Sequence, residues 1–253
     1  MIIKKVKKLK SKVVIIFDDS SKLELDYGTF SNFYLYEGKD VSKKELGLIR
    51  SYSNIAELTQ YALKIRSKSL YSEHKMREKL YAKGANKKEV DQVIKGLKKY
   101  DLIDDKAFAE DLLEYYNSLN YGESKIRSKL LEKGIFPEVI DKLKFPVSLE
   151  RKKANTIFPK LEKKYEKYNY SQRKLHIYNA YLQLGFSIEI ASEMKDKVKD
   201  NNQKHELVAL NKDYEKVLMR LKRKYQKKEL KQKVIAALMA KGYRLNDIIK
   251  VVK

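Results

Sequence analysis

The chain has 253 residues, no cysteine, and 57 Lys plus Arg against 34 Asp plus Glu, for a net charge of +23. This composition excludes a disulfide framework and a cysteine-ligated zinc site, and no run approaches the roughly 20 apolar residues that a membrane-spanning helix needs. The cationic excess favours polyanions or acidic protein surfaces as partners. The apolar run Val13–Phe17 is too short for a secretory signal, so we expect a soluble, cytoplasmic monomer without a membrane contact.

The first 52 residues are predicted to form a small β segment followed by a short helix. The β-branched run Val13–Phe17 precedes a polar turn, and residues 23–27 alternate between apolar and polar, which is typical of a β-hairpin. Because a lone hairpin is only marginally stable in water, a further strand is expected around residues 33–36. Ser42 stands three residues before Glu45, and this capping-box spacing predicts a helix that starts there.

From about residue 53 onward, one pattern recurs four times: two apolar residues spaced by four are followed, four residues later, by a glycine and another apolar residue. The glycines are Gly84, Gly134, Gly185 and Gly242, spaced by 50, 51 and 57 residues. A fixed period near fifty indicates an array of small helical units. We predict a mainly α fold whose tandem three-helix repeats form an elongated curved array after the N-terminal β-hairpin. The repeats are assigned to residues 53–103, 104–147, 148–200 and 201–253.

The middle helix of each repeat is predicted to end at the repeat glycine. In the first repeat the helices should span about 54–68, 72–83 and 87–99. A chain that leaves a helix commonly adopts the left-handed conformation, which glycine takes without steric cost, so the glycines are interpreted as structural caps. Pro159 is expected to break or kink the first helix of the third repeat. Asp200–Gln203 is the predicted linker to the fourth repeat.

No arrangement of residues typical of an active site is found. Asp18-Asp19 and Asp104-Asp105 are adjacent carboxylates without a nearby histidine, and they suit a turn and a helix N-terminus. The three histidines lack metal-ligand spacing, and no phosphate-binding glycine loop is present. The sequence therefore predicts a protein that is not an enzyme and that uses neither a metal nor a cofactor.

The basic residues are distributed unevenly along the chain. Residues 105–149 carry a net charge of −1, whereas residues 204–253 carry +10. A solvated helix face explains any single basic cluster, but the total favours an anionic partner. Nineteen tyrosines interleave with the lysines. They are candidates for stacking on nucleic-acid bases, although several fall on apolar helix faces and suit the core.

Motifs in the first two repeats resemble the RecX family of recombinase regulators. They are Tyr61-Ala62-Leu63 with Arg66, Ser72-Glu73 leading to Lys83-Gly84, Leu102-Ile103-Asp104-Asp105 with Phe108-Ala109, and Lys133-Gly134-Ile135. The third repeat matches weakly, with Leu184 where the others have lysine before the glycine. The N-terminal β segment and the fourth repeat are similar to extra parts of the longer family members.

The resemblance implies a regulator that binds RecA and its filament on single-stranded DNA and inhibits strand exchange, ATP hydrolysis and co-protease activity. It would thereby act in the control of DNA repair, recombination and the SOS response. The alternative is a nucleic-acid-binding protein that competes with RecA for single-stranded DNA, or that contacts single- or double-stranded DNA directly. The candidate contacts to RecA or DNA are Arg66, Arg77, Lys83, Arg127, Lys133, Arg151, Lys152, Lys153, Arg173, Arg220, Arg223, Lys224, Lys227 and Lys228.

Overall fold

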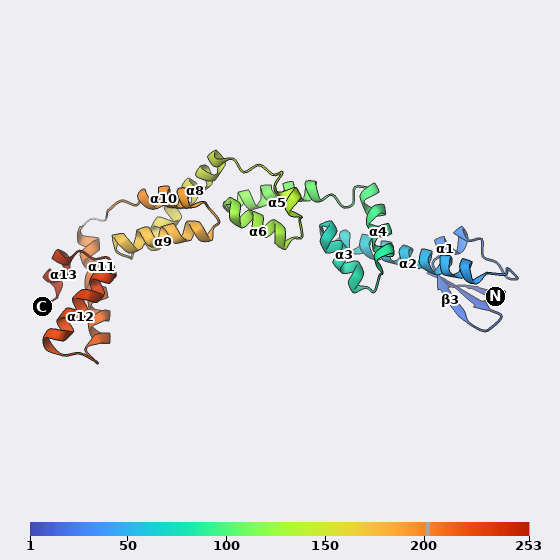
Figure 1. The fold of residues 1–253 in the computed structure, drawn as a ribbon, viewed down its shortest axis with the longest axis horizontal. Coiled ribbons are helices and arrows are strands. Elements are labelled where there is room, and N and C mark those ends of the chain that lie inside the picture. Colours follow the sequence, from blue (N-terminus) through green and yellow to red (C-terminus); the bar gives the residue numbers. More distant parts are fainter. Residues whose placement is uncertain (201–202, 253) are drawn as a thin grey trace. The chain divides into compact units, whose positions relative to one another are not determined.

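The computed structural model describes residues 1–200 and 203–252, with strands at the N-terminus and helices after them (Figure 1). The strands are β1 (Ile3–Lys8), β2 (Val13–Phe17) and β3 (Lys22–Leu25). The helices are α1 (Tyr27–Asn32), α2 (Lys43–Arg66), α3 (Glu73–Ala82), α4 (Lys87–Lys99), α5 (Asp105–Ser118), α6 (Glu123–Glu132), α7 (Pro137–Ile140), α8 (Val147–Tyr165), α9 (Tyr170–Gln183), α10 (Ile188–Asp196), α11 (Gln203–Leu221), α12 (Lys227–Ala240) and α13 (Leu245–Val251). The predicted fold class, mainly helical with a small N-terminal sheet, is confirmed. Asn201 and Asn202 of the expected linker lie outside the described residues.

The N-terminal sheet has the order β1-β2-β3, and both strand pairs are antiparallel. Val13, Ile15 and Phe17 of β2 are buried on one face, as the alternation of a half-buried strand requires. The prediction of a strand around residues 33–36 is wrong. The strand that completes the sheet beside the predicted hairpin is β1, which precedes the hairpin in the sequence. The chain after β3 instead forms α1, where the Asp26 carboxylate caps the helix by accepting the Thr29 N–H at 2.9 Å.

Helix α2 runs without a break from Lys43 to Arg66. The short helix expected within residues 1–52 and the helix expected at 54–68 are therefore one helix. The Ser42 hydroxyl caps its start by accepting the Glu45 N–H at 3.1 Å. Leu46 near this start belongs to the core under the sheet, whereas Ala62 near the far end belongs to the core with α3 and α4. One helix thus serves two hydrophobic cores.

The chain forms two compact units. The first contains residues 1–110 and 131–140, and the second contains residues 111–130 and the chain from 141 onward. In the first unit α2, α3 and α4 enclose one core, which includes Met76 and Leu80. In the second unit α8–α10 enclose a core around Tyr181, and α11–α13 enclose another around Leu238. We call α2–α4, α5–α7, α8–α10 and α11–α13 the four triplets; their assignment to separate repeats stays a prediction.

Helix α8 continues through Pro159, so the predicted break is wrong. A proline within a helix removes one N–H donor and crowds the carbonyl four residues earlier. Ala154 before it and Leu161 after it are both buried in the core of the third triplet. Burial on both sides of the proline holds the helix together despite the lost hydrogen bond.

Each middle helix (α3, α6, α9 and α12) is followed by a glycine in the left-handed region. The φ angles are +85° for Gly84, +78° for Gly134, +87° for Gly185 and +89° for Gly242. Each glycine N–H donates to the carbonyl three residues earlier, at 2.8 to 3.0 Å. A residue with a Cβ incurs a steric cost in this conformation, which is why glycine is the usual residue there.

Three of the four glycine caps are covered by the start of the preceding middle helix, and we call each such contact a junction. At the first junction α3 meets the end of α6, and the buried Ser72 hydroxyl donates to the Lys133 carbonyl at 2.8 Å. The last carbonyls of a helix have no partner within it, and its C-terminus carries the negative end of the helix dipole. The start of another helix supplies hydrogen-bond donors to these carbonyls and places the positive end of its own dipole beside the negative end.

The second junction joins the start of α6 to the end of α9 through the main chain. The N–H groups of Gly122 and Ser124 donate to the carbonyls of Leu184, at 2.8 Å, and Gly185, at 3.0 Å. A Cβ added to Gly122 would lie 2.3 Å from the Gly185 carbonyl carbon. Only glycine permits this approach of the two backbones.

The third junction joins the start of α9 to the end of α12. The buried Asn169 donates from Nδ2 to the Lys241 carbonyl at 2.9 Å, and the Ser171 hydroxyl donates to the Gly242 carbonyl at 3.1 Å. Asn169 also caps its own helix, where its Oδ1 accepts the Gln172 N–H at 2.8 Å. One amide side chain therefore serves both helices.

Each junction contains one further hydrogen bond, from the first N–H of the docked helix to a carboxylate of the next triplet. These bonds are Glu73 N–H to Asp105 (2.8 Å), Glu123 N–H to Glu150 (3.3 Å) and Tyr170 N–H to Glu206 (3.2 Å). Burial raises the pKa of Asp105 and of Glu206 above the usual carboxyl value, although the N–H bond opposes that shift. The recurring carboxylate makes all three junctions chemically alike.

We expect Gly185→Ala to destabilise the chain more than Gly84→Ala. Both glycines have positive φ, where a Cβ costs about 1–2 kcal/mol. A Cβ at Gly185 would lie 2.3 Å from the Lys125 main-chain nitrogen, whereas one at Gly84 would meet no atom within 4 Å. Gly84→Ala thus measures the backbone cost alone, and the additional loss at Gly185, at least about 1 kcal/mol, belongs to the junction. Urea unfolding followed by circular dichroism compares the two, and equal losses would contradict the junction.

Candidate interaction surface

Two predicted arginines among the fourteen candidate contact residues donate to main-chain carbonyls. Arg66 donates from Nε to the Leu102 carbonyl at 2.9 Å. Arg173 donates from Nη2 to the Lys199 carbonyl at 3.0 Å, and only 4% of its surface is exposed. Its guanidinium thus serves the interior of the second unit, and a contact of Arg173 with RecA or DNA stays a prediction.

Lys153 is likewise buried, with 4% of its surface exposed. Its Nζ forms an ion pair with Glu150 at 2.6 Å and donates to Asn117 Oδ1 at 2.9 Å and to the Tyr121 carbonyl at 2.6 Å. A buried ammonium requires such partners because it has lost its hydration. Lys153 thus supports the carboxylate of the second junction, and its contact with RecA or DNA stays a prediction.

Three predicted arginines are engaged in ion pairs on the protein surface. Arg77 and Arg127 have matching partners: each pairs with a glutamate four residues earlier and with an aspartate fourteen residues later, at 2.6 to 2.9 Å. Arg151 pairs with Glu193 at 2.8 Å. Exposed pairs of this kind contribute about 0–1 kcal/mol each. These cations are partly neutralised by their own chain and offer less to an anionic partner.

The remaining predicted residues have exposed side chains that pair with no carboxylate of the described chain; they are Lys83, Lys133, Lys152, Arg220, Arg223, Lys224, Lys227 and Lys228. Five of them lie within residues 220–228, which comprise the end of α11, the connection after it and the start of α12. With Lys222 they form what we call the basic turn. The N–H groups of Lys224 and Tyr225 close it by donating to the Leu221 carbonyl at 2.9 and 3.0 Å. Like charges held this close repel one another, so an anionic partner would relieve the repulsion.

Sequence reasoning missed a second group of cations, also in the second unit. They surround a pocket of about 480 Å³ that we call the aromatic pocket, lined among others by Lys167, Lys212, Lys216, Lys241, Tyr168, His176 and Tyr243. The His176 ring lies 4.5 Å from the Tyr168 ring between centroids. Lys241 pairs with Asp213 at 2.7 Å, while the other three lysines pair with no described carboxylate. The spacing of Lys212 and Lys216 by one turn was visible in the sequence, but the rings come from elsewhere.

The adjacent carboxylates considered as catalytic candidates have structural partners. Asp19 accepts the Ser21 N–H at 2.9 Å within the hairpin turn. Asp104 accepts the N–H groups two and three residues later, at 2.9 and 3.0 Å, and Asp105 serves the first junction. Among the residues that the structure describes, no group of three or more His, Cys, Asp or Glu could hold a metal ion. None of the described helices is long and apolar enough to cross a membrane.

Helix triplets joined through glycine caps, with a surplus of exposed cations, define a helical-repeat protein with a basic surface. Comparison with curated proteins gives regulatory protein RecX of Lactococcus lactis subsp. lactis (strain IL1403), 31% identical over 97% of this chain and 94% of that protein. Regulatory protein RecX of Streptococcus agalactiae serotype III (strain NEM316) is 28% identical over 98% of this chain and 97% of its own. No protein-family model matches the chain.

Two solved structures share the fold. A crystal structure of regulatory protein RecX aligns with a TM-score of 0.63 at 23% identity, covering 78% of this chain and 99% of its own. The crystal structure of RecX from Lactobacillus salivarius aligns with a TM-score of 0.53 at 24% identity, covering 57% of this chain and 96% of its own. The identity of 31% to regulatory protein RecX of Lactococcus lactis, over nearly the whole of both chains, shows that the chain belongs to the RecX family of regulatory proteins.

We expect Lys153→Met to lower the free energy of unfolding by about 3 kcal/mol, because it leaves the Glu150 carboxylate buried without its cation. Lys152→Met is the matched control: Lys152 is adjacent and exposed, and its loss should change stability by no more than about 0.5 kcal/mol. Chemical denaturation of the two variants measures the difference. Equal stability would show that Lys153 is not held in the interior.

Proposed function

We propose that this chain binds RecA and the RecA filament on single-stranded DNA and inhibits its recombinase, ATPase and co-protease activities. It would act as a non-enzymatic cytoplasmic monomer in the control of DNA repair and recombination. Membership of the family of regulatory protein RecX supports this proposal. The structural observation that carries it is the basic turn, where six exposed cations face solvent in the most basic part of the chain.

Weak contacts repeated along the chain suit a filament as the partner. One exposed ion pair contributes little in water and is screened by salt. A filament presents the same surface many times, so a protein with several helix triplets gains from each contact made after the first one. Inhibition should then require far fewer protein molecules than there are DNA sites.

A second candidate function is direct binding of single-stranded DNA in competition with RecA, and the aromatic pocket favours it. Lysines around Tyr168 and His176 place cations beside ring faces, the combination that accepts phosphates and stacked bases. This function requires DNA binding without RecA, steep weakening of that binding by salt, and inhibition only when the protein saturates the DNA.

The first test is the ATPase activity of RecA on single-stranded DNA, measured with increasing amounts of the chain. The triple variant Arg220→Glu, Arg223→Glu and Lys224→Glu should lose at least tenfold in inhibitory potency. The matched control Lys87→Glu, Lys88→Glu and Lys95→Glu makes the same change in net charge at exposed, unpaired positions of α4 and should retain potency. Absence of inhibition by the unaltered chain at levels well below DNA saturation would overturn the proposal.

The double variant Lys212→Ala and Lys216→Ala separates the two candidate functions. If the chain acts on RecA, this variant should lose affinity for single-stranded DNA, measured by fluorescence anisotropy, and keep its inhibition of the ATPase. If DNA competition is the mechanism, both should fall by the same factor. Far-ultraviolet circular dichroism of the variant checks that its fold is intact.

A further inference from the structure

The glycine cap of the first triplet is left uncovered. Gly84 ends α3 with φ of +85°, and a Cβ built there would meet no atom within 4 Å. No described residue donates a hydrogen bond to the carbonyl of Lys83 or of Gly84. At each of the three junctions a carbonyl at this place accepts a hydrogen bond from the start of another helix.

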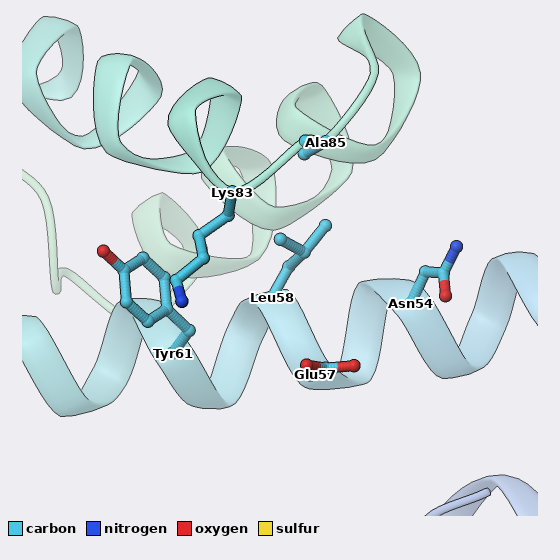
Figure 2. Close-up of a pocket in the computed structure, with 7 residues that line it drawn as sticks. Asn54, Glu57, Leu58, Tyr61, Lys83 and Ala85 are labelled. Atoms are coloured by element: carbon cyan, nitrogen blue, oxygen red, sulfur yellow. The ribbon is translucent and has the colours of Figure 1, made fainter. Parts of the chain in front are cut away.

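A pocket of about 240 Å³ lies at this uncovered cap (Figure 2). It is lined by Lys83 and Ala85 after α3 and by Asn54, Glu57, Leu58 and Tyr61 on α2. In Figure 2 the Lys83 side chain reaches down to the ring of Tyr61, and Leu58 points from α2 toward the cap. The Lys83 ammonium lies 4.9 Å from the centre of that ring. We call this site the open cap.

The open cap occupies the position of a junction within its triplet. The junction carboxylates Asp105, Glu150 and Glu206 each stand four residues before a buried residue of their helix, namely Ala109, Ala154 and Leu210. In α2 the residue four positions before the buried Ala62 is Leu58. At the position where the filled junctions have a carboxylate, the open cap therefore has the apolar side chain of Leu58. The adjacent Glu57 also lines the pocket.

We propose that the open cap is a docking site for the N-terminus of a helix from a partner protein. The three filled junctions define what this helix must carry. Its cap has a short polar residue such as Ser72 or Asn169, or a glycine that lets its main chain approach. Its free first-turn N–H groups bring the positive end of a helix dipole to the negative end of α3.

A second copy of this chain is a poorer occupant than a different protein. Among the described middle helices, α12 is the one whose start covers no glycine cap. It begins at Lys227 after Gln226, whose side chain makes no capping hydrogen bond. Gln226 is neither a short polar residue nor a glycine, so this start lacks the cap that the three filled junctions share.

The probe for this site is a hydrocarbon-stapled peptide with the sequence of residues 70–83, which contains the start of α3. It is titrated into the ¹⁵N-labelled full chain while the amide resonances of Gly84 and Ala85 are followed. We expect saturable shifts at both amides. A control peptide with valine in place of the serine that corresponds to Ser72 should lose them, because it lacks the hydroxyl donor.

The variant Leu58→Asp restores the carboxylate of the filled junctions and should tighten peptide binding about three- to tenfold. Leu58→Asn is its uncharged match, and the full amide spectrum of each variant checks its fold. Shifts that are absent at Gly84 and Ala85, or equal for the valine peptide, would overturn the docking site. Self-association of the chain in sedimentation, together with concentration-dependent shifts at Gly84 and Lys228, would identify a second copy of the chain as the occupant. That result would also overturn the proposal. The titration contains neither RecA nor DNA, so its outcome is independent of the proposed function.

Discussion

The structure depends on one recurring contact, in which the start of one helix donates hydrogen bonds to the free carbonyls at the end of another helix. Each helix end leaves several N–H or carbonyl groups without a partner, and these groups carry the opposite ends of the helix dipole. At a junction, donors at the start of one helix bond the free carbonyls at the end of another, and the opposite dipole ends lie side by side. The contact requires a glycine at the helix end, because φ is positive there and because a Cβ at Gly185 would lie 2.3 Å from the Lys125 main-chain nitrogen. Gly134, Gly185 and Gly242 are therefore sites of contact between triplets, as well as helix caps, whereas Gly84 is a helix cap alone.

Hydrogen bonds and ion pairs within the chain explain why the net charge alone does not identify a partner-binding surface. Lys153 and Arg173 are bound inside the second unit, and Arg77 and Arg127 are paired with carboxylates of their own triplets. Six exposed, unpaired cations lie together in the basic turn, and Lys167, Lys212 and Lys216 line the aromatic pocket. The net charge of +23 counts the buried and paired cations together with these, so it does not locate the surface that a partner would meet.

Much of the fold could be predicted from the sequence, because local signals decide it. The glycine spacing and apolar periodicity located the middle helices, and Ser42 marked the start of α2. Strand β1 was missed because four of its six residues are lysines, although its partner β2 follows it directly in the chain. The junction partners were missed because they are distant in sequence: Ser72 and Lys133 are 61 residues apart. The burial of Lys153 could not be foreseen, since the run Arg151–Lys153 is typical of an exposed basic face, and two of its partners, Asn117 and Tyr121, come more than 30 residues earlier in the chain.

Amide hydrogen exchange at the second junction tests this account most directly. The N–H groups of Gly122 and Ser124 stand at a helix start, where amides ordinarily exchange fast, yet here they donate to Leu184 and Gly185. The account predicts that both exchange as slowly as the core amides of α9, while the amide of Lys228, at the uncovered start of α12, exchanges rapidly. Exchange of Gly122 and Ser124 at the rate of Lys228 would show that the helices are not joined through their glycine caps.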